Sequence, residues 1–501
     1  MARGKSPAFD ALILIVLLSG AMMPGILDAG AAHAAVLRVP DQYPTIFSAL
    51  DAALPGDRVE VQPGVYYEHG LRLRAGVLLT GMEEDPTATV IDGQGRGRIL
   101  NATSPGPIGQ VARLTFQNGW ARGENSYDKS GGAIYINQAK LQIIDCRFAG
   151  NLAEAHGGAI RVMRATPPFI NCEFVGNTAL GGGGGAVDCS YEASPLLEDC
   201  SFRQNLSSWG GAISARGQSD PRILRGEFYS NRTDGDDSFG GGALSFFDSQ
   251  PQYLYSTFYG NRAVRGGAVA ALPGAPARLE HCTVTQNLAT HGAGLFSRDA
   301  SSVIESSIVV FQNGSGVTAE GPLVAQISDS NVHGNSGGDL VGLLPGVEDS
   351  DGNISADPLF CDLDGGLSFN VDIESPVVSE GEGGTMGAWL AGCAGERGIQ
   401  YPAPDLPRIL SIEGLQAAPN PFNPSTRIRF QLESAQRIRA EVYAVDGRRV
   451  RVLADRVYQA GWNLLQWNGR DDGGRGVSSG AYVVLVQGEA ETKTHKITLL
   501  K

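Results

Sequence analysis

The chain has 501 residues, a formal net charge of −14 and 68 glycines. That length exceeds a single ordinary hydrophobic core, so two or more domains are expected. The acidic balance argues against binding to nucleic acid or to anionic membrane surfaces, and the ordinary apolar content excludes a disordered or collagen-like chain.

Residues 1–34 have the organisation of an export signal. Arg3 and Lys5 precede an apolar run from residue 11 to residue 18, and Ala32-His33-Ala34 has the small residues of a cleavage site. The run is too short for a membrane anchor. We therefore expect an exported protein, located at the outer cell surface or outside the cell, with no transmembrane segment after cleavage.

The next region, residues 35–400, begins with a segment that differs from the rest of it. Ile46, Ala49, Leu50 and Ala53 are spaced as on one face of a short helix, which Pro55-Gly56 would end. Such a helix would cover the open end of a solenoid, the fold that the following repeat predicts.

A repeated block dominates residues 131–295. Gly-Gly-Ala followed by an aliphatic residue occurs six times and a weaker Gly-Ala-Gly-Leu copy follows, at steps of 26, 27, 26, 31, 25 and 26 residues. A second signature, Phe-x-x-Asn, recurs between the blocks, with Val replacing Phe in its last copy. Its asparagines are Asn151, Asn177, Asn205, Asn231, Asn261 and Asn287.

The periodicity within each repeat is two. Ile134 and Ile136, for example, flank the polar Tyr135, which predicts a strand with one inner and one outer face. One repeat cannot bury its inner face alone, so we expect an all-β solenoid of roughly 13 stacked coils. The asparagines would stack at a turn and have a structural role, and the glycines would fit tight corners.

The seven cysteines do not have the spacing of a disulfide scaffold. Four of them sit two residues before an apolar position of the repeat, which favours buried thiols. Cys361 and Cys393, near the end of the solenoid region, are the pair that we expect to form a disulfide.

Residues 401–409 are rich in proline and predict a linker. In residues 410–501 short alternating strands are separated by turns, which predicts a small Ig-like β-sandwich. The two regions therefore differ in architecture.

Three family resemblances add to these structural predictions. The repeat of residues 131–295 resembles that of polymorphic outer-membrane proteins, which implies a right-handed parallel β-helix displayed at or outside the cell surface. Residues 36–70 are similar to the opening of pectin esterase-like and pectate lyase-like β-helices, where this segment is a structural cap.

Residues 410–501 resemble the C-terminal sorting domain of type IX secretion, akin to the Ig-like domain of flagellar hook-capping proteins. This resemblance rests on Pro419-Asn420-Pro421-Phe422, Trp467-Asn468-Gly469 and Ser479-Gly480-Ala481-Tyr482, and it implies secretion machinery as a partner; a spacer that stays on the mature protein is the alternative.

The predicted outer face of the repeat contains arginine and tyrosine but few carboxylates. Because arginine and aromatic side chains carry much of protein recognition, we hypothesise a non-catalytic protein that binds a polysaccharide or a surface protein and needs no cofactor. The contact candidates are Tyr135, Arg161, Arg164, Tyr191 and Arg216.

A polysaccharide lyase or glycoside hydrolase is the alternative, with Asp188, Asp234 and Asp248 as catalytic candidates. Asp188 and Asp248 would lie two coils, about 10 Å, apart, too far to share one Ca²⁺ but within reach of a hydrolase pair. Asp234, Asp236 and Asp237 lie in the longest repeat and form either a solvated acidic turn, which we favour, or a Ca²⁺-binding loop. A structural role in a surface layer is a third possibility.

No zinc or nucleophile motif is present in the sequence. His156 and His291 precede glycine corners, so we interpret them as turn residues. Asp349-x-Asp351-x-Asn353 resembles the start of an EF-hand loop but lacks its glycine and glutamate, and is interpreted as a turn.

Overall fold

The computed structural model describes residues 34–103, 105–235, 239–323, 325–342, 352–362, 368–378, 385–389, 391–393, 412–432, 436–444, 448–458, 461–488 and 492–500. The export signal up to residue 33, the linker at 401–409, and Asp236 and Asp237 of the acidic loop lie outside these residues. No helix among the described residues is long and apolar enough to cross a membrane.

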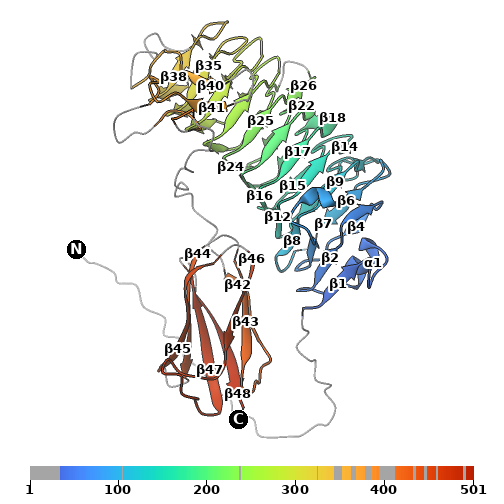
Figure 1. The fold of residues 1–501 in the computed structure, drawn as a ribbon. Coiled ribbons are helices and arrows are strands. Elements are labelled where there is room, and N and C mark those ends of the chain that lie inside the picture. Colours follow the sequence, from blue (N-terminus) through green and yellow to red (C-terminus); the bar gives the residue numbers. More distant parts are fainter. Residues whose placement is uncertain are drawn as a thin grey trace, which may run out of the picture. The chain divides into compact units, whose positions relative to one another are not determined.

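The chain from residue 34 to residue 342 winds into a parallel β-solenoid of about 12 turns, which confirms the predicted all-β solenoid (Figure 1). Each coil passes through three long parallel sheets, named sheets A, B and C in chain order. Sheet A contains β1 (Val36–Val39), β2 (Arg58–Val61), β5 (Leu78–Gly81), β8 (Gly109–Ala112), β12 (Leu141–Ile144), β16 (Pro168–Ile170), β20 (Leu196–Glu198), β24 (Arg222–Leu224), β28 (Gln252–Leu254), β31 (Arg278–Glu280), β34 (Val303–Glu305) and β37 (Gln326–Ser328). Sheet B contains β3 (Gly64–Tyr66), β6 (Thr89–Asp92), β9 (Thr115–Gln117), β13 (Arg147–Ala149), β17 (Glu173–Val175), β21 (Ser201–Arg203), β25 (Glu227–Tyr229), β29 (Thr257–Tyr259), β32 (Thr283–Thr285), β35 (Ile308–Val310) and β38 (Asn331–His333). Sheet C contains β4 (Leu71–Arg72), β7 (Leu100–Ala102), β11 (Ile134–Asn137), β15 (Ile160–Met163), β19 (Val187–Ser190), β23 (Ile213–Arg216), β27 (Leu244–Phe247), β30 (Val269–Ala271), β33 (Leu295–Arg298), β36 (Val317–Glu320) and β39 (Leu340–Val341).

Helix α1 (Ile46–Ala52) lies at the N-terminal end of the solenoid. Thr45 caps it, accepting a hydrogen bond from the Ser48 N–H, and Ile46, Ala49 and Leu50 are buried in the solenoid's apolar cluster. A 3-10 turn, η1 (Pro86–Ala88), precedes β6. The apolar stripe that predicts this helix from the sequence is therefore the face that it buries.

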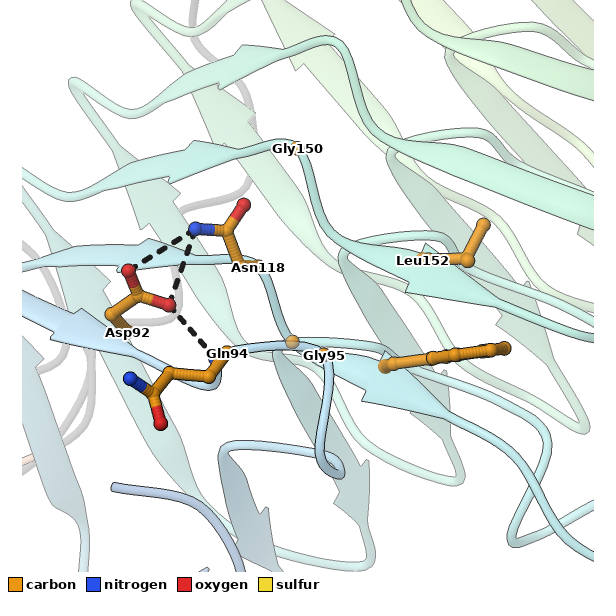
Figure 2. Close-up of a pocket in the computed structure, with 8 residues that line it drawn as sticks. Asp92, Gln94, Gly95, Asn118, Gly150 and Leu152 are labelled. Atoms are coloured by element: carbon orange, nitrogen blue, oxygen red, sulfur yellow. Dashed lines mark hydrogen bonds between the residues drawn. The ribbon is translucent and has the colours of Figure 1, made fainter. Parts of the chain in front are cut away.

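A fourth, shorter sheet exists in only part of the solenoid. Sheet D is inserted between sheets B and C and contains β10 (Trp120–Ala121), β14 (Leu152–Ala153), β18 (Thr178–Gly183), β22 (Leu206–Trp209) and β26 (Arg232–Thr233). The coil before β10 passes from β6 to β7 without such a strand, so β10 is the first strand of sheet D. A hollow lies at this step (Figure 2).

The inner face of sheet B is a stack of phenylalanines. From Phe148 to Phe258, neighbouring rings lie 4.8–4.9 Å apart and within 12° of parallel. The spacing equals that of adjacent strands, because the register places one Phe of each coil directly above the next. The Phe-x-x-Asn signature thus places an aromatic column along the core.

The six asparagines of the same signature form a buried ladder. Along the series, the backbone N–H and the Nδ2 of each donate to Oδ1 of the next at 2.9–3.1 Å, down to Asn287. Nδ2 also donates to a Phe carbonyl of the preceding coil. Gln312 accepts from Asn287, and Asn335 accepts from Gln312, so the ladder continues beyond the signature.

After the last coils the chain folds back as a strap, defined here as residues 368–378 and 385–389, over the outer face of sheet B. The Trp389 Nε1–H donates to Thr257 Oγ1 at 2.7 Å, and the Gly387 N–H donates to the Ser306 carbonyl at 2.8 Å. The Phe369 ring lies 5.5 Å from that of Tyr259. This part of the chain therefore covers part of the outer face of sheet B.

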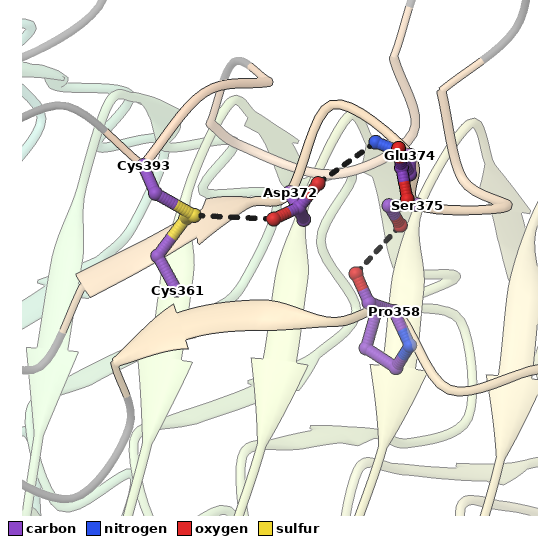
Figure 3. The surroundings of a disulfide bond; sticks show 6 residues. All are labelled: Pro358, Cys361, Asp372, Glu374, Ser375 and Cys393. Atoms are coloured by element: carbon purple, nitrogen blue, oxygen red, sulfur yellow. Dashed lines mark hydrogen bonds between the residues drawn. A yellow bond between two sulfur atoms is a disulfide. The ribbon is translucent and has the colours of Figure 1, made fainter.

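A disulfide joins Cys361 to Cys393 and closes the strap into a loop (Figure 3). Cys361 lies in β40 (Phe360–Asp362), which pairs antiparallel with β41 (Ser368–Val371). The Ser375 hydroxyl donates to the Pro358 carbonyl at 2.6 Å within the same loop. The other five cysteines are buried thiols.

Replacing both Cys361 and Cys393, which are 32 residues apart, by serine is expected to destabilise the strap by about 4 kcal/mol, because the open chain regains the entropy of a loop of this length. Hydrogen exchange at Phe369 to Val371 should then become faster, while exchange in β17 and β21 should not change. A reducing agent should have the same effect on the wild type and none on the variant. Equal exchange of the strap in both proteins would contradict the prediction.

The C-terminal region consists of two antiparallel sheets that share one apolar cluster around Trp467. One sheet contains β42 (Ile412–Ala418), β43 (Thr426–Leu432) and β46 (Gly461–Trp467). The other contains β45 (Arg449–Tyr458), β44 (Gln436–Ala444), β47 (Gly480–Gln487) and β48 (Thr492–Leu499). Strand β42 contains Glu, Gly and Ala residues of low strand propensity, so its own sequence is a weak signal for a strand.

Candidate functional site

The outer side of sheet C carries a column of side chains, one from each strand. In register from β11 to β27, the column consists of Tyr135, Arg161, Asp188, Ser214 and Ser245. Sequence alternation predicts that these residues face away from the core, and they do lie opposite the inner residues of each strand. They are nevertheless buried: Tyr135 and Arg161 are 3 % exposed and Asp188 is 0 % exposed.

The column is covered by side chains that immediately precede the glycine corners, called the roof here: His156, Trp209 and Phe239. The rings of His156 and Trp209 lie 5.8 Å apart, and those of Trp209 and Phe239 lie 5.3 Å apart. Close packing beneath the roof leaves no room for a side chain at Gly183, where an added Cβ would overlap the Trp209 indole. The lack of a side chain at the corner glycines thus allows the roof residues to pack directly against the column.

Asp188 is the centre of a polar network beneath the roof. Its Oδ2 accepts from the Ser190 hydroxyl at 2.6 Å and lies 3.2 Å from Arg161 Nε, and its Oδ1 accepts from the Ser214 hydroxyl at 2.8 Å. Burial opposes ionisation of Asp188, but Arg161, His156, Arg216 and the Ser190 hydrogen bond outweigh it, so the pKa of this carboxyl is below its usual value. The carboxylate therefore links strands β15, β19 and β23.

His156 completes the network from above. Nε2 lies 2.8 Å from Arg216 Nη2, the Gly183 N–H donates towards Nδ1 at 3.2 Å, and Nδ1 is 4.0 Å from Asp188 Oδ1. A neutral imidazole has one acceptor nitrogen, so Arg216 and the Gly183 N–H cannot both donate to the neutral ring at the same time. Burial, together with Arg161 and Arg216 and against the effect of Asp188, lowers the pKa of His156 to about 4.

Acid should destabilise the protein through His156. An unfolded histidine titrates near 6.5, so below that pH the unfolded state binds more protons than the folded state. The stability that neutral His156 contributes is present above pH 6.5 and is lost as the pH falls towards 4. Between pH 6.5 and pH 5 the loss should be about 1.5 kcal/mol.

The measurement is the free energy of unfolding as a function of pH for the wild type and for His156→Gln, whose amide does not titrate. The variant should lose most of the slope between pH 6.5 and pH 5. His69→Gln, at an exposed position, is the matched control and should keep the acid sensitivity of the wild type. An unchanged slope in His156→Gln would refute the assignment.

The five predicted contact residues divide into two groups. Tyr135 is buried, with the Tyr127 ring 4.5 Å from its own, and Arg161 is buried beside Asp188. Arg216 is half-buried against His156, so these three residues are less accessible than the other two. Arg164 and Tyr191 lie in the turns after β15 and β19, both exposed, with the guanidinium carbon of Arg164 5.1 Å from the centre of the Tyr191 ring. Of the five, only this pair can meet a large ligand directly.

The three candidate catalytic carboxylates are not brought into one site by any contact among the described residues. Asp188 is enclosed, whereas Asp234 and Asp248 are exposed in turns after β26 and β27. No group of three or more His, Cys, Asp or Glu side chains that could hold a metal ion occurs in the described part of the chain. The loop carboxylates Asp236 and Asp237 lie outside it.

The comparison with known families agrees with this geometry. Residues 129–290 match a family model described as a right handed beta helix region. The match spans the coils from β11 to β32, including the ladder, the roof and the Asp188 network. No curated protein matches the chain in sequence.

The sequence analysis interprets His156 only as a turn residue and does not single out Trp209, whereas the structure places both over the Asp188 network. The available signal is the position of the two residues in the repeat: both directly precede a Gly-Gly corner, as Arg265 does in a later coil. The alternation rule assigns the strands but says nothing about a loop that folds back over the outer face. Chemically, the network holds a fully buried, ionised carboxylate between two arginines and a neutral imidazole.

Proposed function

We propose that this is an exported, non-catalytic binding protein whose solenoid presents exposed arginine–aromatic pairs to a glycan or a surface protein. The observation that carries the proposal is the different exposure of the polar groups on the outer side of sheet C. Asp188, the catalytic candidate within sheet C, is enclosed and accepts hydrogen bonds from Ser190 and Ser214. Arg164 and Tyr191, in contrast, are exposed at the edge of the sheet.

Further pairs of the same kind support a recognition role. The Arg203 guanidinium carbon lies 5.4 Å from the Tyr229 ring centre on sheet B, and that of Arg122 lies 4.4 Å from the Trp120 ring centre beside sheet D. Stacking holds the arginine in place while its outer N–H groups remain able to donate. Rigid aromatic and guanidinium groups bury area on binding at a low cost in side-chain entropy.

The test is a binding and turnover screen on the mature chain, residues 35–501, against soluble polysaccharides and extracellular proteins. Binding without new reducing ends or unsaturated uronates supports the proposal. The double variant Arg164→Gln/Tyr191→Asn introduces residue types that occupy left-handed positions elsewhere in this chain, such as Gln204 and Asn171. It should weaken the binding of a ligand to this edge about tenfold. Arg278→Gln, on sheet A, is the control. Turnover lost in Asp188→Asn would refute the proposal in favour of a lyase or hydrolase.

The C-terminal region is proposed to act in sorting. Its Pro-Asn-Pro-Phe and Ser-Gly-Ala-Tyr motifs support this assignment, as does its two-sheet architecture. Removal of residues 412–501 should leave the solenoid inside the outer membrane of the producing cell, detected by fractionation. Normal release of the shortened chain would show that the region is only a spacer.

A further inference from the structure

The start of sheet D creates a step in the solenoid surface, and a hollow of about 440 Å³ lies in it. The coil below crosses this corner through a short segment that contains Gly93, Gly95 and Gly97, while the coil above adds β10. Asp92, Gln94, Asn118, Trp120 and Leu152 line the hollow together with three glycines. Its volume lies within the range of about 300–1,000 Å³ that is usual for small-molecule sites.

Trp120 has one strand neighbour in sheet D rather than two. It pairs in register with Leu152 of β14, and the position below it is Gly95, where an added Cβ would lie 3.8 Å from the Trp120 ring. Any larger residue at Gly95 would fill the space beside the indole. The ring is half-buried and held by the Arg122 guanidinium, so it is a fixed apolar surface at the wall of the hollow.

Hydrogen bonds within the protein hold the polar side chains of the hollow in place. Asn118 Nδ2 donates to both oxygens of Asp92 at 3.1 and 3.2 Å, and the Gln94 N–H donates to Asp92 Oδ1 at 2.8 Å (Figure 2). Gln117 Nε2 donates to Asp92 Oδ2 at 3.0 Å. The amide oxygen of Asn118 and the side chain of Gln94 remain at an exposed rim, where they can exchange hydrogen bonds with hydroxyl groups.

We propose that this hollow binds a neutral pyranose unit of a glycan. One face of a pyranose ring is formed by C–H groups that pack against an indole, and its edge carries the hydroxyls that the amides can bond. The carboxylate of Asp92 in the lining disfavours a uronate by like-charge repulsion. The inference rests on the proposed binding function, to which it adds a ligand class and a site separate from the Arg164–Tyr191 edge.

The chain itself supplies matched variants. Gly150 and Gly176 occupy the same turn in successive coils, with φ of +60° and +62°, and Gln204 and Gln286 take this left-handed position in later coils. Only Gly150 lines the hollow, so Gly150→Gln fills it and Gly176→Gln is the control for strain. Trp120→Leu replaces the indole by the residue found at Leu152 and Leu206 in the same register.

The mature chain and these variants are titrated with short cello-, xylo-, chito- and galacturono-oligosaccharides. A neutral oligosaccharide should bind the wild type. It should bind Trp120→Leu and Gly150→Gln at least about tenfold more weakly, and it should bind Gly176→Gln as well as the wild type. If neutral glycan binding survives both hollow variants, or if only the galacturonides bind, the inference is overturned while the binding function stands. A wild type that binds neither glycans nor any protein in the broader screen overturns both. If Gly150→Gln does not fold, the affinity of Trp120→Leu for the neutral oligosaccharide alone decides whether the inference holds.

Discussion

Asn205→Ala is expected to lower the free energy of unfolding of the solenoid by about 3–5 kcal/mol. Asn205 is fully buried in the middle of the ladder. Its Oδ1 accepts two hydrogen bonds from Asn177, and its Nδ2 donates to the Phe174 carbonyl and to Asn231. The change removes all of them, and each buried group left without a partner costs about 1–3 kcal/mol.

The neighbouring Gln204 provides the control for this prediction. Gln204 is exposed in the same turn with φ +55°, and Gln204→Asn keeps a residue that tolerates this conformation. Its effect should stay within about 0.5 kcal/mol. Chemical denaturation followed by circular dichroism measures both variants. Similar midpoints for Asn205→Ala and Gln204→Asn would show that the ladder does not contribute to stability as described.

The ladder also shows how far the sequence signature reaches. Phe-x-x-Asn finds the asparagines because both residues point inward from one turn, and inward positions tolerate few alternatives. The signature ends at Val284 and Asn287 and does not extend to Gln312 and Asn335, the next two members of the ladder. The ladder requires only a side-chain carboxamide that reaches the next coil, and both asparagine and glutamine provide one. A signature that specifies phenylalanine and asparagine does not include the glutamine.

The candidate site was less predictable than the fold for a related reason. Period-two alternation separates the two faces of a strand, but it does not distinguish a face in water from a face under neighbouring loops. Because Arg161 and Asp188 alternate with apolar residues of their strands, the sequence predicts that both are exposed. In the structure both are buried, and His156 covers them. The covering residues lie in loops whose length and composition vary between coils, and the hollow beside Trp120 depends on a strand that the preceding coil lacks.

The second large effect is expected from the Arg161–Asp188 pair. Asp188→Ala removes the carboxylate and leaves the Arg161 charge 3 % exposed beneath the roof, where its Nη1 has no hydrogen-bond partner among the described residues. Breaking a buried ion pair in this way costs about 3–5 kcal/mol. Asp248→Asn changes the exposed carboxylate two coils away and should cost less than about 0.5 kcal/mol.

The double variant Arg161→Met/Asp188→Leu tests whether the pair only stabilises the fold or also contacts the ligand. Two apolar side chains of similar length leave no buried charge, so the double variant should be more stable than Asp188→Ala alone, with a coupling energy of about 2 kcal/mol or more. Additive effects would mean that the two residues do not act as a unit. Because Arg164 and Tyr191 are exposed outside the network, the refolded double variant should keep the ligand of that edge. Loss of binding in a stable double variant would instead place the ligand beneath the roof, in direct contact with Asp188 and His156.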